Sequence, residues 1–136
     1  MKRKLIALCA ALTIIFISVF FVACGGSKKE VEPIAIDLTG TVVEEGETLL
    51  DIMKDRKAEG KLTFEMTDGM ITSINGVANS ITYNPCWMLY TSDKETSSEE
   101  WGTVEYGGKT LGSATVGAES LLVKTGEIYV WVYQSF

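Results

Sequence analysis

The sequence contains no histidine, the side chain that most often acts as a general base or metal ligand near neutral pH. Its serines therefore lack the usual partner of a nucleophilic triad. The phosphate-loop pattern G-x-x-x-x-G-K-S/T is not met either. The adjacent carboxylates Glu44-Glu45 and Glu99-Glu100 would point to opposite faces of a strand, which does not suit paired acid–base chemistry. We predict that the protein is not an enzyme.

Long apolar runs are absent except at the amino terminus. Residues 5–23 carry no charge. They follow the basic start "MKRK" and are followed directly by Cys24. This order is typical of a bacterial lipoprotein signal, although Phe21 stands where leucine is usual. We therefore predict that residues 1–23 are removed, that Cys24 carries lipid, and that residues 24–33 form a tether at the outer face of the cell membrane. The alternative is an uncleaved helix, since residues 5–23 are long enough to span a bilayer.

Cysteine is scarce, with three in the chain. Cys9 would leave with the signal and Cys24 would carry the lipid, so Cys86 would be the single remaining thiol. One thiol excludes an intramolecular disulfide and, in the absence of histidine, a structural zinc site. We expect Cys86 to be a small buried apolar side chain. A reactive or metal-binding thiol is the alternative.

Basic residues are few, with 12 lysines and arginines against 18 acidic residues. Three of the 12 lie in residues 1–23, so the processed chain would hold nine and carry a formal charge of −9. An acidic domain is unsuited to nucleic acid, whose phosphates require a basic surface. It is equally unsuited to electrostatic adhesion to anionic lipids, so the predicted membrane contact depends on the lipid at Cys24.

Residues 34–136 form the predicted folded domain. Apolar residues alternate over residues 34–42, which predicts a strand. Thr48 and Asp51 predict an approximate capping box at the start of a helix, and Gly60 suits its end. The apolar stripe of this helix is expected to pack on a sheet.

Short strands separated by turns follow the helix. The turn signals are Asp68-Gly69, Asn75-Gly76 and Gly107-Gly108, and residues 92–100 form a predicted polar surface loop. We predict strands over residues 62–67, 70–74, 80–83, 86–91, 101–106, 109–116 and 127–136. Residues 128–133 are apolar on both faces, so this strand is expected to be central. The pattern predicts an α+β fold with one helix packed on a mixed or antiparallel sheet.

Four segments of the chain resemble a known family in their order: "GETLLDIM", "ITSINGVAN", "CWMLY" and "GEIYVWVY". They are similar to the transcobalamin carboxy-terminal-like domain of vitamin carriers and bacterial lipoproteins, and the similarity covers roughly residues 36–134. The resemblance implies a β-grasp-like fold and, as in the vitamin carriers, contact with one face of cobalamin. The segment after Tyr90 is longer than in most bacterial members and contains Trp101 and Tyr106.

Aromatic side chains in the second half of the chain are the best candidates for ligand contacts. Trp101 lies in a polar context next to a glycine, where a tryptophan has little reason to be buried, and Tyr106 follows it. The predicted ligand-binding residues are Asn75, Trp87, Tyr90, Trp101 and Tyr106. The candidate ligand is cobalamin or another small amphipathic molecule, and no cofactor is expected. For Trp87 and Trp131 the alternative is core packing, which aromatic residues that alternate along a strand favour.

The alternative function is a cell-surface module that binds a partner protein through a sheet edge. The two hypotheses differ in what they require of residues 91–109. A ligand site requires the aromatic side chains of this segment to converge with Trp87 or Tyr90 in a concavity. An interaction module requires only an exposed edge or patch.

Overall fold

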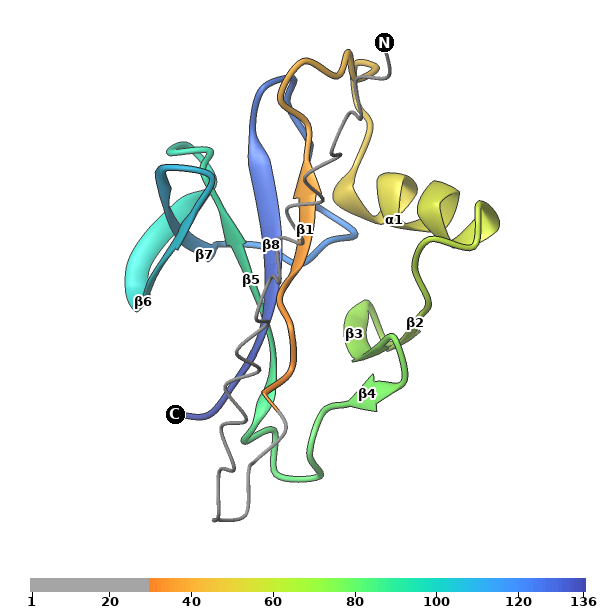
Figure 1. Ribbon diagram of the computed structural model, residues 1–136, viewed down its shortest axis with the longest axis vertical. Helices are drawn as coiled ribbons and strands as arrows, with labels where there is room; N and C mark the ends of the chain where they lie inside the picture. The colour runs from red at the N-terminus through yellow and green to blue at the C-terminus, as the bar shows by residue number, and fades with distance from the viewer. Residues whose placement is uncertain (1–29) are drawn as a thin grey trace, which may run out of the picture. The chain divides into compact units, whose positions relative to one another are not determined.

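The computed structural model describes residues 30–136. The predicted signal peptide, Cys24 and most of the predicted tether lie outside the described residues. Within the described range, residues 31–136 belong to one unit with its own hydrophobic core. Its elements follow one another in this order (Figure 1): β1 (Ile34–Asp37), α1 (Leu49–Ala58), β2 (Phe64–Thr67), β3 (Met70–Ile74), β4 (Val77–Ala78), β5 (Cys86–Thr91), β6 (Ser97–Tyr106), β7 (Lys109–Ala114) and β8 (Ile128–Gln134).

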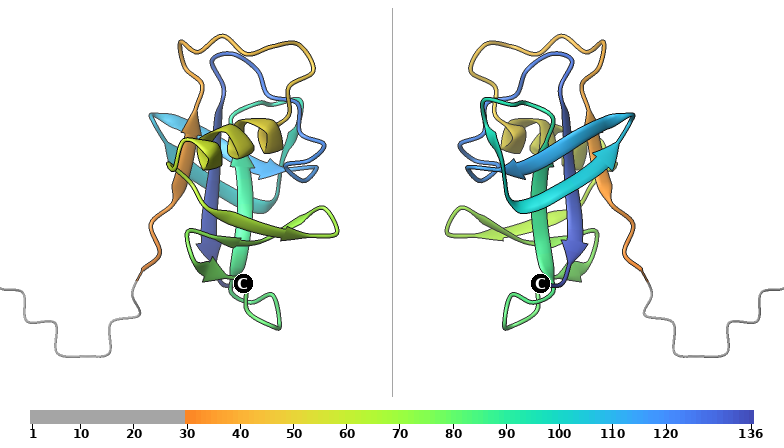
Figure 2. Two further views of the ribbon diagram at one scale, coloured as in Figure 1. Left: turned by 90° about the vertical axis from the view of Figure 1, so that its right-hand side faces the viewer. Right: turned by 90° about the vertical axis from the view of Figure 1, so that its left-hand side faces the viewer.

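The strands form two antiparallel sheets. The larger sheet has five strands in the order β1-β8-β5-β7-β6, and the smaller has three in the order β2-β3-β4. The helix and the three-stranded sheet lie on one side of β5 and β8, and the β6–β7 hairpin crosses their other side (Figure 2). The described residues are therefore a mostly-sheet α+β fold with one helix, as predicted. β8 lies between two strands, as its apolar faces indicated.

The helix begins and ends at the predicted residues. Thr48 and Asp51 form the capping box: the Asp51 N–H donates to Thr48 Oγ1 (3.3 Å), and the Thr48 N–H donates to Asp51 Oδ2 (3.0 Å). Gly60 follows the last turn with a φ of 72°, a value that favours glycine. The buried side chains of α1 include Leu49 and Met53, which pack into the larger core cluster.

Two hairpin turns also have the predicted geometry. Asp68-Gly69 joins β2 to β3 with φ values of 51° and 80°, and Asn75-Gly76 joins β3 to β4 with φ values of 47° and 81°. Two successive positive φ angles define the turn that Asp-Gly and Asn-Gly favour between paired strands. Asn75 also closes this end of the sheet, since its Oδ1 accepts a hydrogen bond from the Thr63 N–H (3.0 Å).

The strand predicted over residues 109–116 ends at Ala114, and two other predicted strands differ more from the structure. The first ends at Asp37 rather than at residue 42, because Asp37 Oδ1 accepts a hydrogen bond from the Thr39 N–H (2.8 Å) and the chain turns there. Residues 80–83, predicted as a strand, instead form a turn closed by a backbone hydrogen bond of 2.9 Å between its end residues. This turn separates β4 from β5, so β2, β3 and β4 form a sheet of their own.

The polar loop predicted over residues 92–100 is too long. β6 begins at Ser97, and Ser97 and Ser98 pair with Ala114 and Ser113 of β7. Composition was misleading here because β6 is an edge strand with mostly exposed residues, and such a strand needs no apolar face.

The interior consists of two clusters on opposite faces of β8. Tyr129 and Trp131 belong to the larger cluster, with residues of α1 and the three-stranded sheet. Ile128 and Val130 belong to the smaller cluster, with residues of β5 and β7. The alternation of side chains along β8 thus supplies both clusters, which explains why both faces of this strand are apolar.

Candidate binding groove

One edge of β5 is open along most of its length. On one side β5 pairs with β8 through all of Cys86–Thr91, but on the other side it pairs with β7 only through Tyr90 and Thr91. Within the described residues, residues 86–89 therefore have no strand neighbour on the β7 side. The Trp87 N–H donates instead to the side-chain oxygen of Asn79 (2.8 Å).

The edge is open because β7 stays paired with β6, whereas its pairing with β5 is limited to two residues. Gly112 lies so close to β6 that a Cβ atom there would be 2.7 Å from Ser98 O, so only glycine allows this approach. Beyond β7, both the N–H (2.9 Å) and the hydroxyl (3.2 Å) of Thr115 donate to Thr96 O. These contacts direct the chain away from β5 after Ser113.

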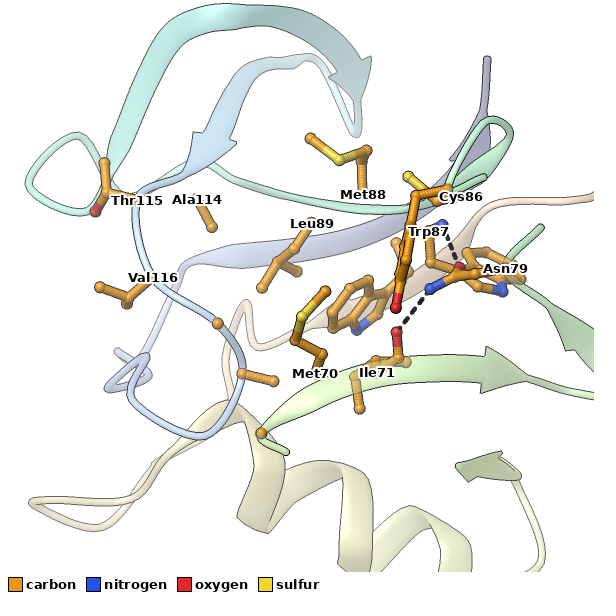
Figure 3. Close-up of a pocket in the computed structure, with 15 residues that line it drawn as sticks. Met70, Ile71, Asn79, Cys86, Trp87, Met88, Leu89, Ala114, Thr115 and Val116 are labelled. Carbon is orange, nitrogen blue, oxygen red and sulfur yellow. Dashed lines mark hydrogen bonds between the residues drawn. The ribbon is translucent and has the colours of Figure 1, made fainter. Parts of the chain in front are cut away.

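A cavity of about 510 Å³ lies along this edge and is called the β5 groove below. Its lining consists of residues 69–71, Asn79, Tyr83, 86–89, 114–118 and Trp131. None of these side chains is charged. Figure 3 shows Met70, on β3, below Leu89, and Val116, beyond β7, to the left of Leu89. Three lining residues are large, apolar and well exposed, namely Met70 (55%), Tyr83 (54%) and Val116 (42%).

The wall formed by the three-stranded sheet is held by side-chain hydrogen bonds. Asn79 bridges the sheets, since its Oδ1 accepts from the Trp87 N–H and its Nδ2 donates to Ile71 O (3.0 Å), as the dashed lines in Figure 3 show. Trp87 Nε1 donates to Val77 O (2.7 Å), and the Tyr133 hydroxyl donates to Ala78 O (2.9 Å). These hydrogen bonds, together with apolar packing in the larger core cluster, hold the three-stranded sheet against β5 and β8.

Trp131 lines the groove but lacks such a contact. Its side chain is 5% exposed. Among the described residues, Trp131 Nε1 is the one buried side-chain nitrogen or oxygen with no hydrogen-bond partner. Such unpaired groups are uncommon in folded proteins, because burial removes the hydrogen bonds to water.

Cys86 lines the groove from β5 and is buried, as predicted. Burial raises the pKa of its thiol above the ordinary value. The thiol therefore stays protonated near neutral pH, and a protonated thiol is a poor nucleophile.

The structure brings only one of the five predicted ligand-binding residues to the groove. Trp87 lines it, whereas Asn75 is a turn residue bonded to Thr63. Tyr90 is 1% exposed, and its hydroxyl donates to Trp101 O (3.2 Å). Tyr90 is therefore a buried packing residue.

Trp101 and Tyr106 lie on β6, outside the lining of the groove. Trp101 is 58% exposed, as its polar context predicted, and it packs edge-on against Phe136 with ring centres 6.2 Å apart. The expected convergence of these two side chains with Trp87 in one concavity does not occur.

Sequence reasoning missed the main groove residues for identifiable reasons. Asn79 was not among the predicted site residues, and Met70 and Val116 were predicted only as members of strands. A signal was present at one turn, where the apolar residue Met70 directly follows Asp68-Gly69. A hairpin turn is normally exposed, so an apolar residue there marks either an unexpected contact or an exposed apolar surface.

The ion pairs formed by Lys124 lie outside the β5 groove. Lys124 Nζ contacts Glu95 and Asp93 (3.0 Å to Asp93 Oδ2), and its hydrogen bonds to Glu95 and Asp93 raise the pKa of Lys124. Burial opposes ionisation of Asp93, but hydrogen bonds from Lys124, the Glu95 N–H and Thr96 outweigh burial and lower its pKa. This cluster fixes the loop before β6 and contributes nothing to the groove lining.

Residues 30–136 contain no group of three or more histidine, cysteine or carboxylate side chains that could hold a metal ion. In the same range no helix is long and apolar enough to cross a membrane. Gly108 is followed by Lys109 and Thr110, which match the end of a phosphate loop, but Lys109 begins β7 rather than a helix.

Comparisons with models of known protein families, with curated proteins and with solved structures find no match to this chain. The fold and the groove alone therefore define the class: an α+β domain with an uncharged groove at an open sheet edge.

Proposed function

We propose that this protein is a lipid-anchored, extracytoplasmic binding protein whose folded domain holds a small amphipathic ligand in the β5 groove. The observation that supports this function best is the uncharged lining of a cavity of about 510 Å³. Small-molecule sites typically have volumes of about 300–1,000 Å³ and mostly apolar linings with a few polar groups. The groove has both properties.

The exposed rim of the groove supports the same conclusion. Met70, Tyr83 and Val116 keep large apolar surfaces in water, at a cost of about 25 cal/mol for each Å² that a ligand would cover. Methionine adapts its shape to different partners, and tyrosine combines an apolar ring with a polar tip. A ligand that is partly apolar and partly polar fits such a rim.

The proposal includes the relationship to the transcobalamin carboxy-terminal-like domain and its β-grasp-like fold. In favour of it, the helix, the Asn75-Gly76 turn and the strand with Trp87 follow one another as the resemblance implies. A corrinoid therefore remains a candidate ligand. A smaller neutral molecule fits the groove better, because Trp101 and Tyr106 are not available there to stack on a corrinoid.

The proposed function is binding without catalysis. The lining holds no histidine, carboxylate or lysine, and its thiol at Cys86 is kept protonated by burial. The groove thus lacks the side chains that most often act as a general acid or base, and its thiol is not activated as a nucleophile.

The open edge of β5 favours a second candidate function. An extended segment of a surface protein would add as a strand beside residues 86–89, where β5 has no neighbour within the described residues. Such a partner would slow amide hydrogen exchange along β5. A small ligand would instead change the NMR signals of the lining side chains.

Titration of the 30–136 fragment with N-phenyl-1-naphthylamine, a neutral dye that fluoresces in apolar surroundings, tests the proposed function. This fragment is suitable because residues 31–136 form one unit with its own core. We expect saturable binding that Val116→Glu weakens by at least about tenfold, since an apolar ligand would then have to cover a carboxylate. Val42→Glu is the matched control: Val42 is 89% exposed and lies outside the lining. Equal effects of the two variants would refute the groove as the site. Cobalamin and cobinamide, tested as competitors of the dye, decide the corrinoid hypothesis.

A further inference from the structure

The indole N–H groups of the three tryptophans differ in their hydrogen-bond partners. Trp87 Nε1 donates to Val77 O at 2.7 Å. The Trp101 side chain is 58% exposed, so water is available to it. Trp131 is 5% exposed, and its Nε1 has no acceptor among the described residues. Trp131 also lines the β5 groove, so an acceptor that enters the groove comes close to the side chain whose N–H lacks a partner.

Met70 is the side chain best suited to give way to such an acceptor. It lines the same groove and is 55% exposed, so few contacts restrain it. In Figure 3 it extends from β3 toward Leu89 on β5. The methionine side chain has three rotatable bonds and changes conformation at little cost.

The charges around the groove indicate a neutral ligand. No basic side chain lines the groove, so an anion would lose its water without gaining a counter-charge. At one end, Glu119 lies against the β2–β3 turn: a Cβ atom added at Gly69 would be 2.7 Å from Glu119 Oε2. This carboxylate further disfavours an anionic ligand.

We infer that the ligand of the β5 groove is a neutral molecule with an apolar body and an acceptor oxygen, and that this oxygen accepts a hydrogen bond from Trp131 Nε1. The inference depends on the proposed binding function and specifies the ligand class. The apolar body lies between Met70 and Val116, and the oxygen reaches the floor formed by Trp131. A carbonyl or ether oxygen satisfies the requirement, because an indole N–H only donates.

Three probes of similar size test this inference on the 30–136 fragment labelled with ¹⁵N and ¹³C. Acetophenone is neutral and has a carbonyl acceptor, isopropylbenzene has the same number and connectivity of non-hydrogen atoms without an acceptor, and benzoate adds a charge. We expect acetophenone to move the Trp131 indole N–H signal downfield and to slow its hydrogen exchange. Isopropylbenzene should move the methyl signals of Met70 and Val116 without this effect on the indole, and benzoate should not bind.

Trp131→Phe removes the donor and keeps an aromatic ring. We expect it to weaken acetophenone binding about 2- to 10-fold more than isopropylbenzene binding, the effect of one hydrogen bond. Trp101→Phe is the control, since Trp101 lies outside the groove, and it should change neither affinity. If Trp131→Phe does not fold, the indole signals of the wild-type fragment decide the question.

The outcomes separate this inference from the proposed function. Binding of both neutral probes without a difference at the Trp131 indole would overturn the inference and leave the groove function standing. Benzoate binding as tight as that of acetophenone would overturn the neutral ligand class. If none of the three probes binds, both proposals fail.

Discussion

The floor of the β5 groove and the β6–β7 hairpin both carry tryptophans on strands, yet they differ in almost every physical respect. Trp87 and Trp131 are each 5% exposed, whereas Trp101 on β6 is 58% exposed. The sequence context predicted the exposure of Trp101. It did not predict which of the two regions is concave. The exposed tryptophan lies on an edge strand. Of the two buried tryptophans, Trp87 lies where β5 lacks a strand partner on one side, and Trp131 lies on β8, which is paired on both sides.

The exposure of a tryptophan side chain is therefore by itself a poor guide to a binding site. A binding site needs side chains on more than one side of the ligand. In this fold they come from strands that separate after a short paired stretch. β7 leaves β5 after Ser113, and the three-stranded sheet approaches from the other side through Asn79. β6 has a strand neighbour on one side only, so Trp101 has no such enclosure.

The largest expected effect is the loss of stability on removing a groove-floor tryptophan. Trp131→Ala should lower the free energy of unfolding by about 3–5 kcal/mol, because the side chain is buried in the larger core cluster. Urea denaturation of the 30–136 fragment measures this change. A loss below about 1 kcal/mol would mean that the groove floor is not part of the core.

Cys86 tests whether the groove admits a polar reagent in the native state. Its thiol should react with a charged disulfide reagent about 10- to 100-fold more slowly in the folded fragment than in urea, because burial keeps it protonated. Spectrophotometric labelling at pH 8 measures both rates.

The pH dependence of Cys86 has a definite sign. Its pKa is raised in the folded state, so above the unfolded value of about 8.5 the folded state holds more protons than the unfolded state. The contribution of Cys86 to stability should therefore be present below that pH and decline above it, and Cys86→Ala should remove this decline. An unchanged pH profile in the variant would show that the thiol is not desolvated.

The two buried indoles give a sharper comparison. Trp87→Phe removes the donor to Val77 O and leaves that carbonyl without its partner, whereas Trp131→Phe removes a donor that has no partner among the described residues. Both variants lose the same volume. We therefore expect Trp87→Phe to cost about 1 kcal/mol more than Trp131→Phe in urea denaturation. Equal costs would indicate that Trp131 Nε1 has an acceptor in solution.

Local chemistry explains which parts of this fold were predictable. The capping box at Thr48, the Asp-Gly and Asn-Gly turns and the alternation of β8 depend on neighbouring residues, and all three were predicted correctly. The separate three-stranded sheet was not predicted, because it depends on the turn at residues 80–83. The groove was missed for a related reason: it exists because a strand pairing ends, and the end of a pairing between β5 and β7 has no local signal.

The smallest expected effect concerns Trp101, the residue that sequence reasoning favoured most. Trp101→Ala should lower the free energy of unfolding by less than about 1 kcal/mol, since its edge-on contact with Phe136 is worth about 0.5–1.5 kcal/mol and part of it lies in water. The affinity of the groove for N-phenyl-1-naphthylamine should not change, because Trp101 lies outside the lining. Phe136→Ala is the matched variant and should have the same small effect. If Trp101→Ala instead weakens dye binding while stability is retained, the site includes β6, and the distinction between the concave and the exposed region no longer holds.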